Sequence, residues 1–442
     1  MMFRKETEFQ ETEIGKFPKD WKVVKLKDIL ILLRNGLTLR QRKDGKGYPV
    51  TRIETISEEK IDPTKLGYVT GLSEKDIEEY RLIEGDILFS HINSLDHIGK
   101  TAIYEGEPEL LLHGMNLLLL RPNKNIVHPR FLLYLLRLFR ARKIFSTMAK
   151  KAVNQASINQ TELGNLKIPL PPLEEQKRIA DILSMIDSGI EAVDRAIAKL
   201  ERMKRALLNE LLTGRIRVRE ENGKLTFYKE TEFQDAEIGK IPKDWKIEML
   251  GHLINYVKGK KPKKLYDQRI NENNLPYLTA EYMRGLEAPK WCNPEEDPNI
   301  IKVNSDDVIM IWDGSYAGHV FTGFNGALAS TMIKIVPKYN NLDKKFMYYY
   351  LTISFQRLRG TTIGTGVPHI NKKIFEELYI PLPSSVEEQT AIAEILSTVD
   401  KAIELYRREK ERLLRLRRGL MGVLLTGRVR VVSDVRDVGV VV

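Results

Sequence analysis

The sequence predicts a mixed α/β protein, in which two strand-rich domains are separated by a pair of long antiparallel coiled-coil helices. A pseudo-twofold internal repeat relates the two halves. Three observations lead to this prediction. Two blocks of sequence occur twice, two long stretches carry a heptad pattern of apolar residues, and the segments between them carry short strand signals broken by Gly and Pro.

The repeat is the strongest of the three observations. Residues 3–26 recur at 227–250 with 17 of 24 positions identical, and residues 174–217 recur at 387–430 with 22 of 44 identical. The offset changes from 224 to 213 between the two blocks, so the segments between them have diverged in length and content. These segments, of about 140 and 130 residues, are too long to be loops. We therefore expect two domains that differ from each other but are mounted in the same way, and a pseudo-twofold arrangement that brings the chain ends together.

The heptad pattern predicts a helix over residues 173–212. Its apolar positions alternate in steps of four and three, with Lys204 in the slot left over, and Lys410 and Arg417 lie in the seam of the second copy. Prolines precede both stretches, and Gly214 and Gly427 follow them as stop signals. Such a pair of helices is either a coiled-coil spacer with no further role or a rigid spacer that fixes the distance between the two domains. The basic run from Arg407 to Arg418 is either a solvated helix face or a surface for phosphates or subunits.

Each divergent segment shows the same order of elements. A strand follows Trp21 or Trp245, and β-rich stretches are expected at residues 48–53 and 275–280. A turn that leads into a buried strand is expected at 85–90 and at 306–311. A helix is expected at 130–141 and at 343–356. Short helices are expected at 160–164 and 372–377, each preceded by an asparagine, Asn159 or Asn371, that is typical of an N-cap.

The composition bounds the class of protein. The chain has 442 residues with 71 Lys+Arg against 60 Asp+Glu, a formal charge of +11, which favours a polyanionic partner such as nucleic acid. A single cysteine, Cys292, excludes internal disulfides and cysteine-based zinc clusters. No signal-peptide pattern and no membrane-spanning apolar run occur, so we expect a cytoplasmic protein that makes no membrane contact.

Sequence motifs for catalysis are missing. There is no P-loop and no Asn/Asp-Pro-Pro-Tyr/Phe motif of an amino-methyltransferase, and the seven histidines are scattered without metal-binding spacing. The carboxylates form no nuclease pattern that both copies share. We therefore expect a protein without catalytic, cofactor or metal residues of its own, and a stand-alone nuclease is disfavoured.

Several motifs together resemble one protein family. They are Lys-Asp-Trp-Lys at 19–22 and 243–246, Ser-Ile-Asn-Gln-Thr-Glu-Leu at 157–163, Lys-Ile-Pro-Leu-Pro-Pro-Leu-Glu-Glu-Gln at 167–176, and the paired Leu-Leu-Thr-Gly-Arg. The combination is similar to that of the specificity subunits of type I restriction–modification systems, and it covers nearly the whole chain. The second copy of the Pro-Leu-Pro motif, at 381–389, carries a one-residue insertion.

The resemblance implies a non-catalytic subunit that recognises a bipartite double-stranded DNA target. The implied domains are a first target-recognition domain (1–168), a first conserved long helix (169–215), a link with the second recognition domain (216–380), a second long helix (381–428) and a tail (429–442). The implied partners are two modification subunits, which methylate adenine, and restriction subunits that translocate DNA. S-adenosylmethionine, ATP and magnesium would be bound by those partners. The alternative, from a different class, is a coiled-coil scaffold with two protein-binding heads.

We place the DNA contacts on the loop that closes each recognition domain. Asn and Gln can pair with adenine edges, and Lys or Arg can meet guanine or phosphate. The candidate residues are Asn154, Gln155 and Asn159 in the first domain, supported by Arg52, and His369, Asn371 and Lys372 in the second. Asn159 and Asn371 could instead serve only as helix caps.

Overall fold

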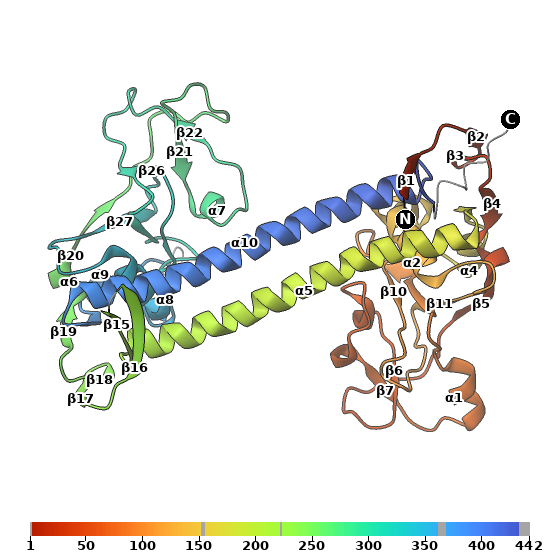
Figure 1. Ribbon diagram of the computed structural model, residues 1–442, viewed down its shortest axis with the longest axis horizontal. Helices are drawn as coiled ribbons and strands as arrows, with labels where there is room; N and C mark the ends of the chain where they lie inside the picture. Colours follow the sequence, from red (N-terminus) through yellow and green to blue (C-terminus); the bar gives the residue numbers. More distant parts are fainter. Residues whose placement is uncertain (1, 152–154, 222, 361–367, 433–442) are drawn as a thin grey trace. The chain divides into compact units, whose positions relative to one another are not determined.

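The computed structural model describes residues 2–151, 155–221, 223–360 and 368–432 (Figure 1). The chain divides into two compact units. Unit 1 combines residues 1–194 with residues 408–442, and unit 2 consists of residues 195–407. Unit 1 is therefore built from the first and the last parts of the sequence, whereas unit 2 is continuous.

Two long helices run through the sequence at the places that the heptad pattern indicates. Helix α5 spans Leu173–Leu212, as predicted, and helix α10 spans Val386–Leu424. Gly214 and Gly427 lie just beyond the helix ends, and both have a φ of +68°. Because this left-handed conformation costs a residue with a side chain more than it costs glycine, these residues end the helices.

The cations in the heptad seam have partners on the opposite helix. In unit 1, Arg417 pairs with Asp187 at 2.8 Å and Lys410 with Asp194 at 2.5 Å. In unit 2, Lys204 pairs with Asp400 at 2.5 Å, and Arg407, which lies beside the seam, pairs with Glu201 at 2.8 Å. Within each unit, the residue numbers rise along α5 while they fall along α10. The two helices are thus antiparallel within each unit, and much of the basic run is engaged in ion pairs.

Each unit carries a head whose main sheet has four antiparallel strands. In unit 1 the order is β10 (Thr101–Ile103), β8 (Ile87–Ser90), β11 (Leu117–Pro122) and β5 (Leu30–Asn35). In unit 2 it is β25 (Val320–Phe321), β24 (Val308–Ile311), β27 (Met332–Pro337) and β20 (Ile254–Lys258). The buried strands β8 and β24 follow the predicted turns, so the core of the two heads is built in the same way.

The heads differ in the structure added to this sheet. Unit 2 has a second four-stranded sheet with the order β22 (Trp291–Cys292), β21 (Leu275–Leu278), β26 (Gly326–Leu328) and β23 (Lys302–Val303), in which β21 and β26 are parallel. Unit 1 has the pair β6 (Tyr48–Val50) and β7 (Gly67–Val69), together with helix α1 (Glu74–Tyr80). These additions give each head its own surface.

Two of the predicted strands are shorter than expected. The strand expected at residues 48–53 ends at Val50, because residues 54–56 form a 3-10 turn in which the Thr55 hydroxyl accepts a hydrogen bond from the Arg52 amide. The strand expected at 275–280 ends at Leu278, because Thr279 caps helix α7 (Ala280–Met283). The predicted helices are present as α2 (Pro129–Ala141) and α8 (Lys344–Arg359).

The heads are joined to the long helices by matching strand pairs. Strand β4 (Lys22–Lys25) pairs with β14 (Lys167–Leu170), and β19 (Lys246–Met249) pairs with β28 (Tyr379–Leu382). Each first strand follows a buried tryptophan, Trp21 or Trp245, and each second strand leads into a long helix. Two small hairpins, β2–β3 (Phe9–Thr12, Gly15–Pro18) and β17–β18 (Phe233–Ala236, Gly239–Pro242), precede the tryptophans.

The chain ends meet in unit 1, as the repeat predicts. Strand β1 (Met2–Lys5) pairs antiparallel with β29 (Val429–Val432), with Lys5 opposite Val429. In unit 2, the hairpin of β15 (Ile216–Glu221) and β16 (Lys224–Lys229) has the same register, with Lys229 opposite Ile216. Strands at the two termini therefore occupy the place that a continuous hairpin occupies in unit 2.

A buried arginine fixes each of these strand pairs. Arg430 contacts Glu6, Asp20 and Glu175 at 2.7–2.9 Å, and Arg217 contacts the matching set of Glu230, Asp244 and Glu388 at 2.6–2.9 Å. Burial alone would lower the pKa of each guanidinium, but the bonds to carboxylates raise it instead. Both arginines are consequently held in the charged form.

No helix in the described ranges combines the length and the apolar character that a membrane span requires.

Candidate nucleic-acid interface

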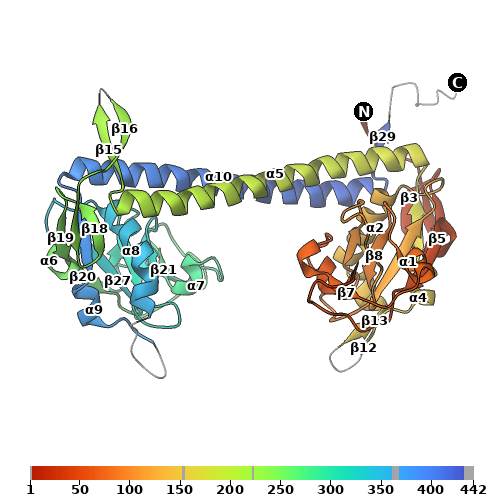
Figure 2. The same ribbon diagram turned by 90° about the horizontal axis from the view of Figure 1, so that it is seen from below.

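The loop that closes each head is held by the same backbone contacts in both units. The amide of Ile158 donates to the carbonyl of His91 at 2.9 Å, and the amide of Ile370 donates to the carbonyl of Trp312 at 3.0 Å. Strand β13 (Ala156–Ser157) pairs with β9 (Ile92–Asn93), and His369 forms a bridge with Asp313 at the matching place. The main sheet thus sets the position of both loops, which lie at the end of each head away from the long helices (Figure 2).

Asn159 and Asn371 both cap short helices, as the sequence predicts. Asn159 accepts a hydrogen bond from the Glu162 amide at 2.7 Å at the start of α4 (Gln160–Gly164), and Glu162 accepts one from the Asn159 amide. Asn371 accepts from the Lys373 amide at 3.0 Å at the start of α9 (Lys372–Glu376). In each cap the side-chain oxygen is the acceptor, and an asparagine amide nitrogen is a donor that capping does not use.

In unit 2, the structure brings all three predicted residues together. His369, Asn371 and Lys372 line a hollow of about 370 Å³, which is completed by Tyr256, Lys258, Trp312, Ile333 and Ile370. The rings of Tyr256 and Trp312 stack with their centroids 5.5 Å apart. Lys372 is 69% exposed and lies 3.7 Å from Glu376. The hollow therefore combines an aromatic wall with an amide and with two lysines, Lys372 and Lys258, which are paired with Glu376 and Asp313.

Tyr256 is fixed in this wall by its hydroxyl. It donates to Oε1 of Glu376 at 2.9 Å, and burial together with this carboxylate raises the pKa of Tyr256 to about 12. Phe375 packs edge-on against both rings, with centroids 5.8 and 5.4 Å away. The wall is consequently rigid, and the hydroxyl stays protonated as a donor at neutral pH.

In unit 1, the predicted residues are less closely grouped. Gln155 is exposed directly before β13, and Asn154 lies outside the described residues. The guanidinium of Arg52 faces Glu54, with Nε 3.2 Å from Oε2, and Nη1 donates to Gln41. The Arg52 bond is the main cause that lowers the pKa of Glu54. Because this carboxylate occupies the fork of Arg52, a bidentate contact with guanine would require the ion pair to open.

The sequence interpretation missed two basic segments that directly follow matching strands. After β5 come four exposed cations, Arg40, Arg42, Lys43 and Lys46, and after β20 come four more, Lys260, Lys261, Lys263 and Lys264. Lys258, at the end of β20, lines the same hollow as Lys372. Five lysines within residues 258–264 form a charge run that was visible in the sequence, and such runs are typical phosphate contacts.

The described part of the chain holds no group of three or more His, Cys, Asp or Glu side chains that could bind a metal ion.

Comparison with known proteins gives one consistent result. A family model for the type I restriction modification DNA specificity domain matches residues 18–202 and 242–415. Over 434 residues, the chain is 45% identical to a putative type I restriction enzyme specificity subunit, MjaX, of Methanocaldococcus jannaschii, and the match covers 98% of this chain and 99% of the relative. The MjaVIII specificity subunit of the same organism is 40% identical over 202 residues, which is 46% of this chain and 47% of that protein.

A solved structure shares the fold. The crystal structure of the type I restriction–modification S subunit from M. genitalium matches 91% of this chain and 96% of that one, with a TM-score of 0.61 at 17% identity. The family model covers well over half of the sequence, and it covers the two heads separately. The chain therefore belongs to the family of type I restriction–modification DNA specificity subunits.

Proposed function

We propose that each head reads one half of a two-part DNA target, and that the long helices set the gap between the halves. A type I specificity subunit with two target-recognition domains is a non-catalytic subunit of its system. The observation that supports one half-site per head is that the heads are held by identical backbone contacts at Ile158 and Ile370 but present different side chains beyond them. Because the same backbone contacts hold the closing loop in each head, the two loops have the same position relative to their sheets. Their different side chains would therefore contact different bases.

The proposal assigns a role to each part of the sequence. Residues 1–168 and 216–380 contain the two recognition domains, residues 169–215 and 381–428 contain the long helices, and residues 429–442 form the tail. The pair of helices would act as one antiparallel coiled coil with pseudo-twofold symmetry, supported by the ion pairs within each unit.

The proposed DNA contacts are of two kinds, contacts with base edges and contacts with backbone phosphates. Gln155 and Asn159 in the first head, and His369, Asn371 and Lys372 in the second, approach base edges, while the basic segments after β5 and β20 neutralise phosphates. Arg52 contributes only if its pair with Glu54 opens. Asn154 belongs to the same loop by sequence.

The proposal also includes the partners. Two modification subunits would bind S-adenosylmethionine and methylate adenine, and restriction subunits would use ATP and magnesium. The assembly would act on cytoplasmic DNA.

The test exchanges one head. Residues 22–165 are replaced by the corresponding segment of another family member, and the methylated motif is determined by sequencing the methylome of cells that also make the modification subunit. We expect one half-site to change while the other half-site and the gap stay the same. A motif changed in both halves would contradict the assignment of one half-site to each head.

A further inference from the structure

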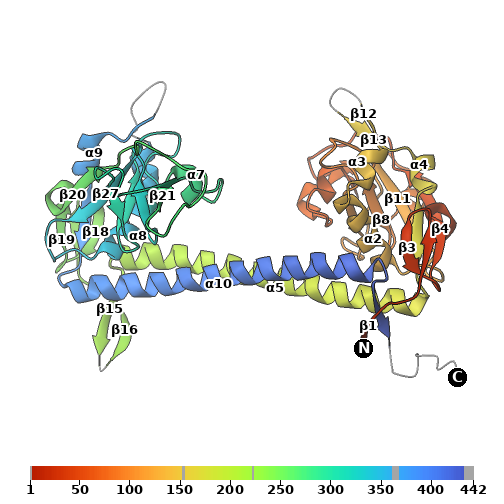
Figure 3. The ribbon, with the colours of Figure 1, turned by 90° about the horizontal axis from the view of Figure 1, so that it is seen from above.

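A pocket of about 250 Å³ lies in unit 1 between helix α2 and the last turns of α10. Each helix contributes one face, because its lining residues lie three or four positions apart. The lining consists of Tyr134, Arg137, Leu138, Arg140 and Ala141 of α2, Leu414, Arg417, Arg418 and Met421 of α10, and Glu59. Helix α2 lies against the long helices, whereas β13 in the closing loop lies at the far end of the head (Figures 2 and 3). The pocket is therefore separate from the loop to which we assign base contacts.

Arginines supply most of the charge in this pocket. Arg140 pairs with Glu59 at 2.7 Å, and Arg137 lies 3.6 Å from the same carboxylate. Arg417 pairs with Asp187 at 2.8 Å, and this second carboxylate also lies 3.7 Å from Arg137. Three guanidinium groups therefore share two carboxylates.

A fourth arginine increases the imbalance. Arg418 is exposed and forms no ion pair with any residue that the structure describes, so the pocket has a surplus of two positive charges. Hydrogen-bond donors are in excess as well, because each guanidinium carries five N–H groups. The buried Nε groups of Arg137 and Arg140 find no acceptor within the described ranges. The pocket therefore offers charge and donors that its own carboxylates do not satisfy.

The backbone at Glu59 is strained. It has a φ of +58°, in the left-handed region that favours glycine, and its carbonyl accepts a hydrogen bond from Arg137. Strain of this kind persists where the surroundings fix a residue, and it is frequent at ligand sites. The conformation of Glu59 keeps two guanidinium groups of α2 at the pocket.

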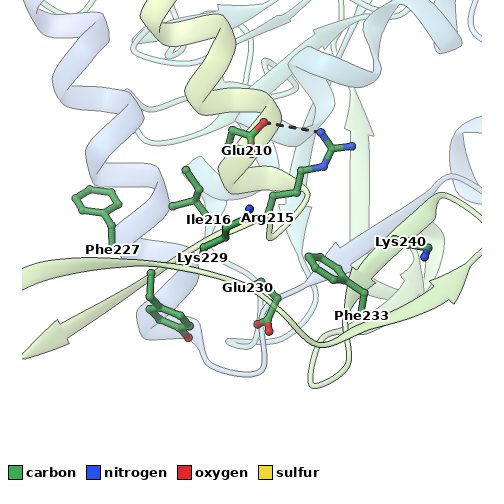
Figure 4. A pocket seen from close by; sticks show the side chains of 9 residues that line it. Glu210, Arg215, Ile216, Phe227, Lys229, Glu230, Phe233 and Lys240 are labelled. Carbon is green, nitrogen blue, oxygen red and sulfur yellow. Dashed lines mark ion pairs between the residues drawn. The ribbon is translucent and has the colours of Figure 1, made fainter.

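The matching surface of unit 2 lacks the two arginines of α2. Tyr349 of α8 corresponds to the tyrosine of the pocket, because each of them donates to the aspartate that joins a head to the long helices. Three and six positions later, α8 has Thr352 and Phe355 in the places of the arginines. The pocket of unit 2 in Figure 4 lies instead at the β15–β16 hairpin, where Arg215 faces Glu210 and aromatic side chains form the wall. In the described chain, the arginine pocket is thus a feature of the first head.

We propose that this pocket binds the phosphate group of a small molecule, either inorganic phosphate or a phosphate monoester. Bound there, the phosphate would bridge arginines of α2 and α10 and would fasten the first head to the long helices. The proposal goes beyond the proposed function, because it holds for any base sequence that the heads recognise.

Geometry and charge both favour this class of ligand. A guanidinium presents parallel N–H donors that match two phosphate oxygens. A phosphate monoester carries about −1.5 to −2 charges at pH 7, which matches the surplus of two. A carboxylate carries a single charge, and DNA carries one charge per phosphate, so either of them would leave part of the surplus unpaired.

The test titrates inorganic phosphate into the full chain by calorimetry, with the ionic strength held constant by sodium chloride. We expect one binding site per chain. Bound phosphate should slow hydrogen exchange by at least about threefold in peptides of α2 and of residues 408–424, because a ligand of the folded state suppresses its opening. Sodium chloride alone should not slow it.

Substitutions of Arg418 locate the site. Arg418→Gln should weaken phosphate binding by at least about tenfold, because it removes a charge-assisted contact. Arg418→Lys keeps the charge but not the fork and should bind with intermediate affinity. Since this side chain is exposed, the urea midpoint without phosphate should stay parental in both variants. The matched control is Arg205→Gln, an exposed arginine at the same position of α5 by the offset of the repeat, and it should keep parental affinity.

Competition identifies the source of the phosphate. Displacement of inorganic phosphate by a lower concentration of adenosine monophosphate would support the site and assign it to a monoester, whereas binding of inorganic phosphate alone would support it and assign it to the free ion. Three outcomes would overturn the proposal. They are an absence of phosphate binding, an equal loss of affinity in Arg418→Gln and Arg205→Gln, and protection of the α2 peptides by duplex DNA but not by phosphate.

Discussion

Asp187 of α5 and Arg417 of α10 form an ion pair at 2.8 Å, and the same carboxylate accepts a hydrogen bond from the hydroxyl of Tyr134 on α2 at 2.8 Å. Unit 2 repeats this arrangement with Asp400, which pairs with Lys204 and accepts from the hydroxyl of Tyr349 at 2.9 Å. Burial raises the pKa of Tyr134 to about 12, so its hydroxyl remains a donor. One carboxylate in each unit therefore joins the head to both long helices.

Replacing this carboxylate should loosen the head. Asp187→Ala leaves Arg417 and the Tyr134 hydroxyl without their shared partner, so we expect unit 1 to lose about 2 kcal/mol of stability. Asp194→Ala removes a more exposed pair, with Lys410, and should cost less than about 1 kcal/mol. Hydrogen exchange of peptides from α2 measures the loss of protection in each variant. Equal protection in the two would show that the head is not attached through Asp187.

Removing Arg430 should separate the chain ends. Arg430→Leu removes the cation that the carboxylates of Glu6, Asp20 and Glu175 share, which we expect to cost about 3–5 kcal/mol and to expose β1 and β29 to exchange. Arg217→Leu is the matched variant in unit 2. Its strands are separated by only two residues of the sequence, so the β15–β16 hairpin should lose less protection than β1 and β29. A larger loss in the hairpin would contradict this account.

Substitution of the capping asparagines distinguishes a role in helix stability from a role in base recognition. Asn159→Ala and Asn371→Ala should each cost about 1 kcal/mol, whereas serine, which also caps helices, should restore stability. If these side chains also read bases, the serine variants will have parental stability but altered preference between target and scrambled DNA. Urea unfolding and DNA binding by the assembled methyltransferase provide the two measurements. If the serine variants keep the parental preference for target over scrambled DNA, the asparagines serve only as helix caps.

Two buried histidines should make unit 1 sensitive to mild acid. Burial lowers the pKa of His91 and of His113 from 6.5 to about 4. The unfolded chain takes up protons below pH 6.5 while the folded chain does not, so stability is complete above pH 6.5 and falls as the pH drops toward 4. We expect a loss on the order of 2 kcal/mol per ring at pH 5 relative to pH 7.

The test compares urea unfolding of unit 1 at these two pH values. His91→Phe should reduce the difference in stability, since the matching residue in unit 2 is Trp312, an aromatic side chain that does not titrate. His97→Gln, at an exposed position, is the control. An unchanged difference in His91→Phe would show that the ring of His91 does not carry the effect.

Lengthening the helices should widen the gap in the DNA target. Seven residues inserted into both helices, after Ala192 in α5 and at the matching level of α10, preserve the heptad phase and add about 10 Å. At about 3.4 Å per base pair, the gap should grow by roughly three base pairs. Sequencing the methylated motif reports the result. Four residues inserted into α5 alone would shift the seam by a stutter and should reduce stability, while a motif with its original gap would contradict the role as a ruler.

Local patterns made the long helices predictable. The bounds of α5 follow from the heptad spacing, from the prolines before Leu173 and from Gly214 after Leu212, all of which act within a few residues. The meeting of β1 with β29 was also predictable, because the offsets of the repeat place Val429 where Ile216 lies. The capping role of Asn159 and Asn371 followed from their positions before the short helices.

Contacts between distant residues were not predictable from one sequence. Arg430 finds Glu6 across 424 positions, and nothing in the local sequence marks either of them as a partner. The parallel pairing of β21 with β26 and the hollow formed by Tyr256, Trp312 and His369 depend on how strands cross within the head, which a single sequence does not specify. The pairing of Arg52 with Glu54 depends on a 3-10 turn at Glu54–Ile56, directly after the stretch where a strand was expected.

The pairing of β1 with β29 also determines the order in which a ribosome can complete the protein. Leu424, Leu425 and Val431 belong to the same hydrophobic core as Trp21, Phe131 and Leu183, so the core of unit 1 stays open until residues 424–431 have been translated. Unit 2, in contrast, is continuous and can fold while translation is still in progress. A nascent chain therefore carries an unfinished first head while the second head is being made, and a chain that stops before Leu424 would have an intact second head and an open first one.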